Sequence, residues 1–152
     1  MTTNQDDTSA VQQWTGSFES VPLGAEEKVE RLVEGRTIDL FADAVQSFHP
    51  IHMSLEWVKQ HTQYPDRIAH GLLTSALMSR PIVNFCERFA IKSVLVSSSA
   101  KYVRPVFAGD TVTTTLTLVE KLAPKKRLRF AVLSVNQRGE VVMTGEVVEQ
   151  AI

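Results

Sequence analysis

The hydrophobic pattern changes period near the middle of the chain, and this change constrains the fold most. From Ala69 onward the longest apolar helical pattern of the sequence begins. Its apolar residues are Leu72, Leu73, Ala76 and Leu77. From Val94 onward the residues alternate between apolar and polar or are β-branched, which is typical of strands. A helix this apolar has to be covered on most sides, so it is expected to pack against the strands that follow.

Four strands are predicted in the second half of the chain, at 94–106, 111–122, 127–136 and 141–148. They are separated by turn signals at Ala108-Gly109-Asp110, Ala123-Pro124 and Arg138-Gly139. Short turns between successive strands indicate an antiparallel sheet, and a helix against one face buries both surfaces. The sequence therefore predicts an α+β protein with the outline of a hot dog fold, an antiparallel sheet wrapped around a long central helix.

The first half of the chain is expected to be mainly helical. We predict a short edge strand at 14–18, connecting structure with charges at helical spacing at 25–33, and extended backbone at 36–38. Asp39 is then the N-cap of a helix with Leu40, Phe41, Ala44, Val45 and Phe48 on its apolar face, which Pro50 ends. A second helix follows from Ser54 to about Thr62, then a loop at 64–67, and Pro81 kinks or ends the central helix.

Length and composition favour one domain without a nucleic-acid or membrane partner. The chain has 152 residues, of which 1–13 are predicted to form a flexible polar arm and 14–152 a single domain. The 16 Lys and Arg residues nearly balance the 17 Asp and Glu residues, so no net field attracts phosphate backbones or anionic lipid. Because 1–13 lacks a signal-peptide pattern and no apolar run is long enough to span a bilayer, a cytoplasmic location is expected.

The lone cysteine and the basic run are both given ordinary structural roles. Cys86 lies in an apolar stretch, which favours an inert buried thiol over a nucleophile. The basic run of Lys125, Lys126, Arg127 and Arg129 is interpreted as a solvated turn. No second cysteine and no His-Glu-x-x-His motif accompany these residues, so neither a metal nor a cofactor is expected.

Histidines are the most informative residues of the sequence. The four are His49, His52, His61 and His70, and His49-Pro50-Ile51-His52 places two imidazoles on one turn that proline makes rigid. Such a pair serves either to hydrogen-bond the backbone, or to catalyse a reaction or bind a ligand. The residues alone leave these readings open.

A glycine stands where the central helix begins, in the segment Ile68-Ala69-His70-Gly71. The first amides of a helix have no partner within it, and they suit a thioester carbonyl that gains negative charge as its enolate forms. A glycine before a helix is also a common packing feature, and by itself the segment does not separate the two interpretations.

Three ordered motifs carry a family resemblance that spans most of the chain. The segment from Phe41 to His52 reads FADAVQSFHPIH, the segment from Arg67 to Thr74 reads RIAHGLLT, and the segment from Arg104 to Thr111 reads RPVFAGDT. The first resembles the motif of the MaoC-like enoyl-thioester hydratases and dehydratases, in which a Phe is followed by Asp-x-Asn-Pro-Ile/Leu-His. The other two match that family in the right order.

The resemblance implies a hydro-lyase that adds or removes water across a trans-enoyl thioester and gives the (R)-3-hydroxyacyl form. It assigns the catalytic histidine to His52 and the oxyanion amide to Gly71, with no cofactor. Substrate contacts are expected at Ile51, Ala69, His70 and Leu72. The implied substrates are thioesters of coenzyme A or of a carrier protein, in fatty acid or polyketide metabolism. The implied assembly is a homodimer with the acyl site between subunits, or a heteromer with a related chain.

The chain departs from the motif at two positions, since Ser47 stands in place of the aspartate and His49 in place of the asparagine. A serine hydroxyl is a poor base, so the usual two-residue mechanism needs a substitute. The substitute is His52 acting alone, His49, or Asp43 one helical turn before Ser47. Ser47 as a nucleophile is a weaker alternative, and 71–79 offers no acid. A non-catalytic, partner-dependent subunit and a thioesterase or tailoring enzyme stay open as alternatives.

Overall fold

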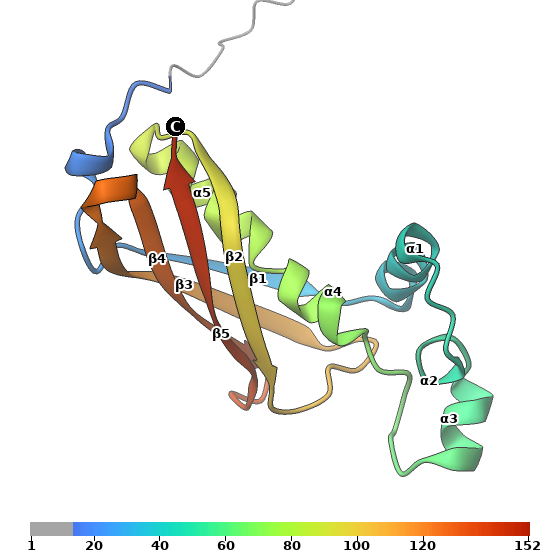
Figure 1. The fold of residues 1–152 in the computed structure, drawn as a ribbon. Helices are drawn as coiled ribbons and strands as arrows, with labels where there is room; N and C mark the ends of the chain where they lie inside the picture. The colour runs from blue at the N-terminus through green and yellow to red at the C-terminus, as the bar shows by residue number, and fades with distance from the viewer. Residues whose placement is uncertain (1–13) are drawn as a thin grey trace, which may run out of the picture.

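One antiparallel sheet forms the body of the protein. The computed structural model describes residues 14–152, and the predicted arm at 1–13 lies outside the described residues. The strands are β1 (Glu26–Leu32), β2 (Ser93–Tyr102), β3 (Thr111–Leu122), β4 (Arg127–Asn136) and β5 (Val141–Ala151). They lie in the order β1-β3-β4-β5-β2, so β1 and β2 are the edges of the sheet (Figure 1).

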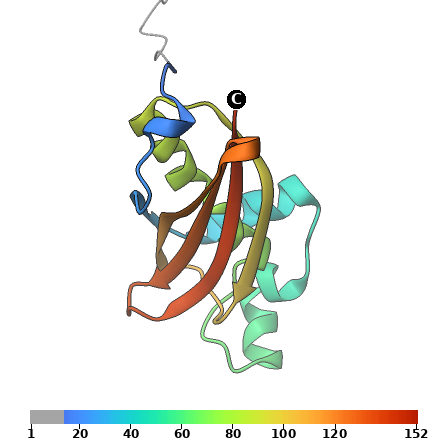
Figure 2. The same ribbon diagram turned by 60° about the vertical axis from the view of Figure 1, so that its left-hand side comes forward.

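The helices form two groups. Helices α4 (Gly71–Ala76) and α5 (Ser79–Phe89) lie along one face of the sheet, whereas α1 (Gly35–Val45), α2 (Pro50–Met53) and α3 (Leu55–His61) stand beyond one end of it (Figures 1 and 2). Two short 3-10 helices, η1 (Phe18–Ser20) and η2 (Ala123–Lys125), complete the elements. The predicted α+β architecture, with a curled antiparallel sheet around a central helix, is confirmed.

The core lies between α5 and the curled face of the sheet. Alternate residues of β3 and β4 are buried, as expected for strands with one covered face. The rings of Phe85 on α5 and Phe130 on β4 meet edge to face at 4.8 Å between centroids. A side chain at Gly145 would overlap the Ser99 carbonyl oxygen, so this glycine lets β5 and β2 approach closely.

Three predictions about strands are wrong. Residues 14–18 do not form an edge strand, because 14–17 have no regular structure and the Ser17 side chain caps η1 by accepting from the Ser20 amide. Residues 25–33 are not merely a connection: they contain β1, whose residues pair with the threonine-rich strand β3. The strand predicted at 94–106 ends at Tyr102, because the chain turns away from the sheet there. The other three strands lie where the alternation and turn signals place them.

The first helix begins earlier and ends earlier than predicted. α1 starts at Gly35, so 36–38 are helical rather than extended, and Asp39 lies within the helix instead of capping it. It ends at Val45, because its C-cap Gln46 adopts a left-handed conformation (φ 56°), and Pro50 begins α2 rather than ending α1. Its buried residues are Ile38 and Ala42, so the helix is rotated relative to the predicted apolar face.

The predicted second helix is confirmed, and the predicted break in the central helix lies before Pro81 rather than at it. Ser54 caps α3 by accepting a hydrogen bond from the Trp57 amide (3.2 Å). The central helix is interrupted at Leu77 and Met78, and Pro81 lies in the first turn of α5, where no amide is available to bond the Leu77 carbonyl. Within the described residues, no helix is long and apolar enough to cross a membrane.

Candidate active site

The turn between α1 and α3 presents His52 toward the start of the central helix. His49 is the N-cap of α2, where its Nδ1 atom accepts a hydrogen bond from the Ile51 amide (3.2 Å). Pro50 occupies the first helical position, where its missing N–H costs nothing. His52 therefore lies in one turn of helix that both a proline and a side-chain cap hold in place.

The tautomer of His52 follows from its hydrogen bond. Its Nδ1 atom lies 2.8 Å from the carbonyl oxygen of Ile68. A carbonyl only accepts, so a neutral His52 carries its proton on Nδ1 and has a lone pair on Nε2. Burial lowers the pKa of His52, the Ile68 hydrogen bond opposes that shift, and the charges of His70 and His49 lower the pKa further. The ring is thus a neutral base at pH 7.

His70 connects His52 to the start of the central helix. It is only 6 % exposed, and its Nε2 atom donates to the Ser47 carbonyl oxygen at 2.9 Å. Its ring stacks on that of His52 with centroids 3.8 Å apart. The remaining nitrogen, Nδ1, is buried without a hydrogen-bond partner in the described part of the chain. Because His70 immediately precedes Gly71, the stack places the His52 imidazole against the N-cap residue of α4.

A pocket lies beside Gly71. Its volume is about 320 Å³, and it is lined by residues that include Ile68, Ala69, Gly71, Thr74, Tyr102 and Val106; we call it the Gly71 pocket. A β-carbon at Gly71 would lie only 3.2 Å from the Tyr102 ring. Glycine therefore allows this ring to pack directly against the backbone. Tyr102 is fixed by a short hydrogen bond to the Ser75 hydroxyl. The Gly71 amide donates no hydrogen bond within residues 14–152 and is free for a ligand.

The loop after β2 holds the segment that leads into Gly71. The Ala69 amide donates to the Val106 carbonyl (2.7 Å), and the Ala108 amide donates to the Arg67 carbonyl (2.9 Å). Ile68, whose carbonyl accepts from His52, lies between these two bonds. The position of His52 relative to Gly71 therefore depends on the shape of this loop.

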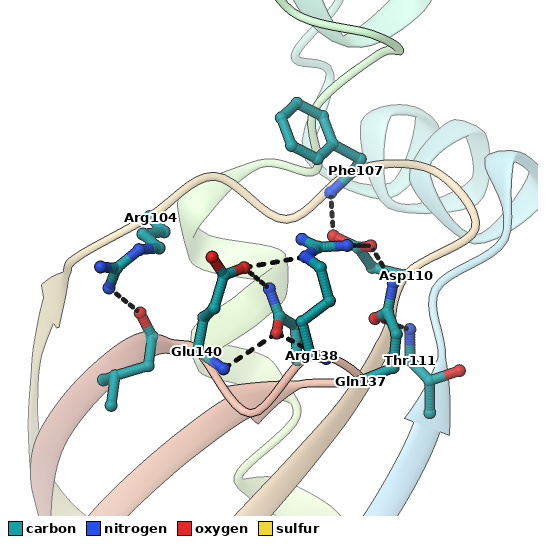
Figure 3. Close-up of polar contacts among 9 residues, drawn as sticks. Arg104, Phe107, Asp110, Thr111, Gln137, Arg138 and Glu140 are labelled. Carbon is teal, nitrogen blue, oxygen red and sulfur yellow. Dashed lines mark hydrogen bonds and ion pairs between the residues drawn. The ribbon is translucent and has the colours of Figure 1, made fainter.

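A buried carboxylate fixes that loop. Asp110 is 4 % exposed, and its carboxylate accepts from the Phe107 amide (2.9 Å), from Gln137 (2.7 Å) and from Arg138 (3.3 Å). Figure 3 shows these donors converging on Asp110 from its own loop and from the turn between β4 and β5. Glu140 binds the opposite side of the Arg138 guanidinium at 2.8 Å. The carboxylate thus ties the loop to the turn between β4 and β5, in addition to the backbone hydrogen bonds that Gly109 and Asp110 form with Val33.

The structure brings some of the predicted site residues together and leaves others apart. His52, His70 and Gly71 are adjacent, and Ser47 joins them through its backbone. The His49 ring is exposed, lies 6.2 Å from that of His52 and contacts Trp57 instead (5.7 Å). Asp43 is also exposed.

The predicted substrate contacts occupy different positions around this group. The Ile51 carbonyl accepts from the Ile68 amide (3.3 Å), Ala69 is buried in the wall of the Gly71 pocket, and Leu72 is 69 % exposed. In the described part of the chain, no carboxylate hydrogen-bonds to His52.

Two residues that organise the site were missed in the sequence. Arg67 forms an ion pair with Asp39 on α1 (2.7 Å) and donates to the His52 carbonyl oxygen (3.2 Å), so it ties two helices to the loop before Gly71. Tyr102 packs on Gly71 from the end of β2. Arg67 begins the second of the three sequence motifs, which was the available signal. No sequence signal pointed to Tyr102, because its contact with Gly71 depends on the path of β2 relative to α4.

The remaining sequence features have structural roles. Burial raises the pKa of Cys86, whose sulfur lies 3.2 Å from the Ser93 hydroxyl, which agrees with an inert thiol. The basic run lies on η2 and the start of β4, and Arg129 within it forms ion pairs with Glu120 (2.7 Å) and Glu146 (2.5 Å). These contacts agree with a surface turn.

Solved structures share this fold over nearly the whole chain. An antiparallel sheet curled around a central helix is the architecture of the hot dog fold. The R-hydratase PhaJ1 from Pseudomonas aeruginosa superimposes with a TM-score of 0.78 and 30 % sequence identity, over 88 % of this chain and 84 % of that one. The predicted hot dog fold is confirmed.

Sequence comparison narrows this class to one family. The MaoC like domain model matches residues 20–139. The (R)-specific enoyl-CoA hydratase of Rhodospirillum rubrum is 30 % identical over 129 residues, which are 85 % of this chain and 87 % of the relative. The 3-hydroxybutyryl-CoA dehydratase of Methylorubrum extorquens is 29 % identical over 129 residues, 85 % of this chain and 80 % of that protein. The chain belongs to the MaoC-like domain family.

Proposed function

We propose that the chain is a hydratase and dehydratase of acyl thioesters, a hydro-lyase that interconverts trans-enoyl and (R)-3-hydroxyacyl thioesters. The observation that carries the proposal is a neutral His52, with its Nε2 lone pair free, stacked on the residue before the unpaired Gly71 amide. The names of the relatives support it, since one is an (R)-specific enoyl-CoA hydratase and one a 3-hydroxybutyryl-CoA dehydratase. For the same reason we propose coenzyme A thioesters as the substrates.

The geometry supports a simple course for hydration. The thioester carbonyl accepts a hydrogen bond from the Gly71 amide, which stabilises the negative charge that develops on that oxygen. Because α4 has only six residues, the amide itself contributes more than the helix dipole. His52 Nε2 takes one proton from water as the water oxygen bonds to C3 of the enoyl group. The imidazolium then gives that proton to C2, and the reverse sequence expels water.

We assign the acid and base roles to His52 alone. Ser47 has a hydroxyl that can orient the attacking water but does not accept its proton near neutral pH. The Ser47 carbonyl positions His70, which in turn supports the His52 ring. His49 Nδ1 is engaged by the Ile51 amide and the ring lies away from His52, which supports a capping role for this residue.

Ultraviolet absorbance of the conjugated thioester tests the proposed reaction directly. Purified protein is incubated with a series of trans-enoyl-CoA substrates, and the absorbance is expected to fall to a constant equilibrium value. The same value is expected from the (R)-3-hydroxyacyl-CoA side and not from the (S) isomer. Absence of turnover with every chain length would rule out the proposal.

The pH dependence of kcat/KM is a prediction from the environment of His52. Because burial lowers its pKa, His52 stays neutral to a lower pH than an ordinary histidine. The acidic limb of the profile is therefore expected below the ordinary histidine pKa of about 6.5, with activity lost as the pH falls through it. A pH-rate profile measured with one enoyl-CoA substrate tests this. A limb above the ordinary value would mean that the imidazolium is stabilised, contrary to the structure.

We also propose a homodimer that forms along β2. This edge strand exposes Val94, Leu95 (60 % exposed) and Val96, and Leu72 on α4 is exposed as well. An uncovered apolar edge of this kind is a template for pairing with a second copy. Sedimentation is expected to give twice the monomer mass, and a stable monomer at micromolar concentration would contradict this. The cytoplasmic location stays a prediction.

A further inference from the structure

A second pocket lies between α5 and the beginning of β2. Its volume is about 320 Å³, and its lining includes Trp14, Ile82, Val83, Cys86, Ser93 and Glu149. We call it the Glu149 pocket. Most of its wall is apolar, as in a site for an aliphatic or aromatic group. The proposed reaction uses none of these residues.

Glu149 is the unusual member of this wall. Glu149 is 4 % exposed, and the Ser93 hydroxyl donates to its Oε2 atom at 2.7 Å. Within residues 14–152 no other side chain or amide hydrogen-bonds to the Glu149 carboxyl, and Lys92, which also lines the pocket, is exposed. Burial raises the pKa of Glu149. A buried carboxyl with a single donor is costly, and a ligand that donates a second hydrogen bond offsets that cost.

Strand pairing in the proposed β2 dimer brings this pocket toward the proposed active site of the second copy. When β2 pairs antiparallel with its copy, a two-fold axis perpendicular to the sheet keeps the helices of both subunits on the same face. The Ser93 end of one β2 then lies beside the Tyr102 end of the other. Ser93 binds Glu149, and Tyr102 packs on Gly71. In the proposed β2 dimer, the end of β2 that carries the Glu149 pocket of one subunit therefore lies beside the end that carries the Gly71 pocket of its partner.

We propose that the Glu149 pocket receives the distal end of the acyl chain whose thioester carbonyl binds at the partner's Gly71, and that Glu149 selects acyl chains bearing a hydroxyl group at that end. This inference rests on the proposed function and on the β2 dimer. A hydroxyl suits the site better than an ammonium group, because it donates to the carboxyl without bringing a second charge out of water. The apolar wall accommodates the methylene groups that precede it.

The test compares two medium-chain trans-enoyl-CoA substrates of equal length, one with a terminal methyl group and one with a terminal hydroxyl group. Wild-type protein is expected to favour the hydroxylated chain in kcat/KM by about tenfold, the size of one good hydrogen bond to a buried carboxyl. Glu149→Leu is expected to reverse this preference, whereas Glu149→Gln, which keeps an acceptor oxygen, retains part of it. Glu146→Leu is the matched control, because Glu146 lies exposed on the same strand.

Binding of the two saturated acyl-CoA analogues, measured by calorimetry, separates this inference from the proposed function. The expected ratio of dissociation constants is again about tenfold in favour of the hydroxylated chain. If the ratio appears and Glu149→Leu removes it, the pocket is supported even where no thioester turns over. The inference is overturned if wild-type protein prefers the methyl-terminated chain, if Glu149→Leu leaves the ratio unchanged, or if neither analogue binds.

Discussion

Replacing His52 with alanine is expected to lower kcat/KM for enoyl-CoA hydration by about 1,000-fold, within the range that positioned general acids and bases contribute. In the proposed mechanism His52 is the base, and no carboxylate among residues 14–152 hydrogen-bonds to it. Steady-state rates by ultraviolet absorbance, with circular dichroism to verify folding, measure the effect.

Two further variants make this result specific. His52→Gln retains a side-chain donor for the Ile68 carbonyl but has no base, so it is expected to be as inactive as His52→Ala. His61→Ala is the matched control, because His61 is exposed on the next helix and its Nδ1 atom binds only the local Trp57 carbonyl. Retention of more than a tenth of wild-type activity in His52→Gln would contradict the assigned role, and activity equal to that of His52→Ala supports it.

Replacing Asp110 with alanine is expected to have the largest effect on stability. The change leaves the Phe107 amide and the Gln137 and Arg138 side chains without their common acceptor in a buried site. Removing one member of a buried charged network costs about 3 kcal/mol, a fall in Tm of roughly 10 °C for a chain of this size. Thermal unfolding followed by circular dichroism measures the change.

The control for this prediction is Glu140→Ala, which removes an exposed carboxylate from the same arginine and is expected to shift Tm little. Because the Asp110 loop holds 67–69 through two backbone hydrogen bonds, Asp110→Ala is also expected to lower kcat well below its own Tm. A Tm within 2 °C of the wild-type value would mean that the loop does not depend on this carboxylate. The predicted shift is well above that threshold.

Elements defined by local patterns were predictable, and those defined by distant contacts were not. β3 and β4 match their predictions at both ends, because alternation and turn residues are encoded within each strand. β1 was missed because it is a largely exposed edge strand that carries many charged residues. The spacing of these charges also fits a helix. α1 was misplaced because its end is set by the left-handed Gln46 rather than by the more obvious Pro50.

The candidate site was predictable as far as its motifs extend. His52, His70 and Gly71 lie in short segments of characteristic sequence, and the structure brings those segments together. The contribution of Tyr102 depends on the path of β2, and that of Asp110 on donors from the turn after β4, so neither follows from local sequence. The free lone pair of His52 was also not predictable, since the Ile68 carbonyl that fixes the tautomer is 16 residues away.

Hydration in water enriched in oxygen-18, followed by mass spectrometry of the products, tests most directly whether His52 and Gly71 serve a hydro-lyase. With wild-type protein and a trans-enoyl-CoA, the heavy oxygen is expected in the C3 hydroxyl of an intact (R)-3-hydroxyacyl-CoA, and His52→Ala is expected to lose this incorporation. Heavy oxygen in a free carboxylate, released together with thiol, would instead identify hydrolysis of the thioester. Either that result or the absence of labelled product would contradict the account.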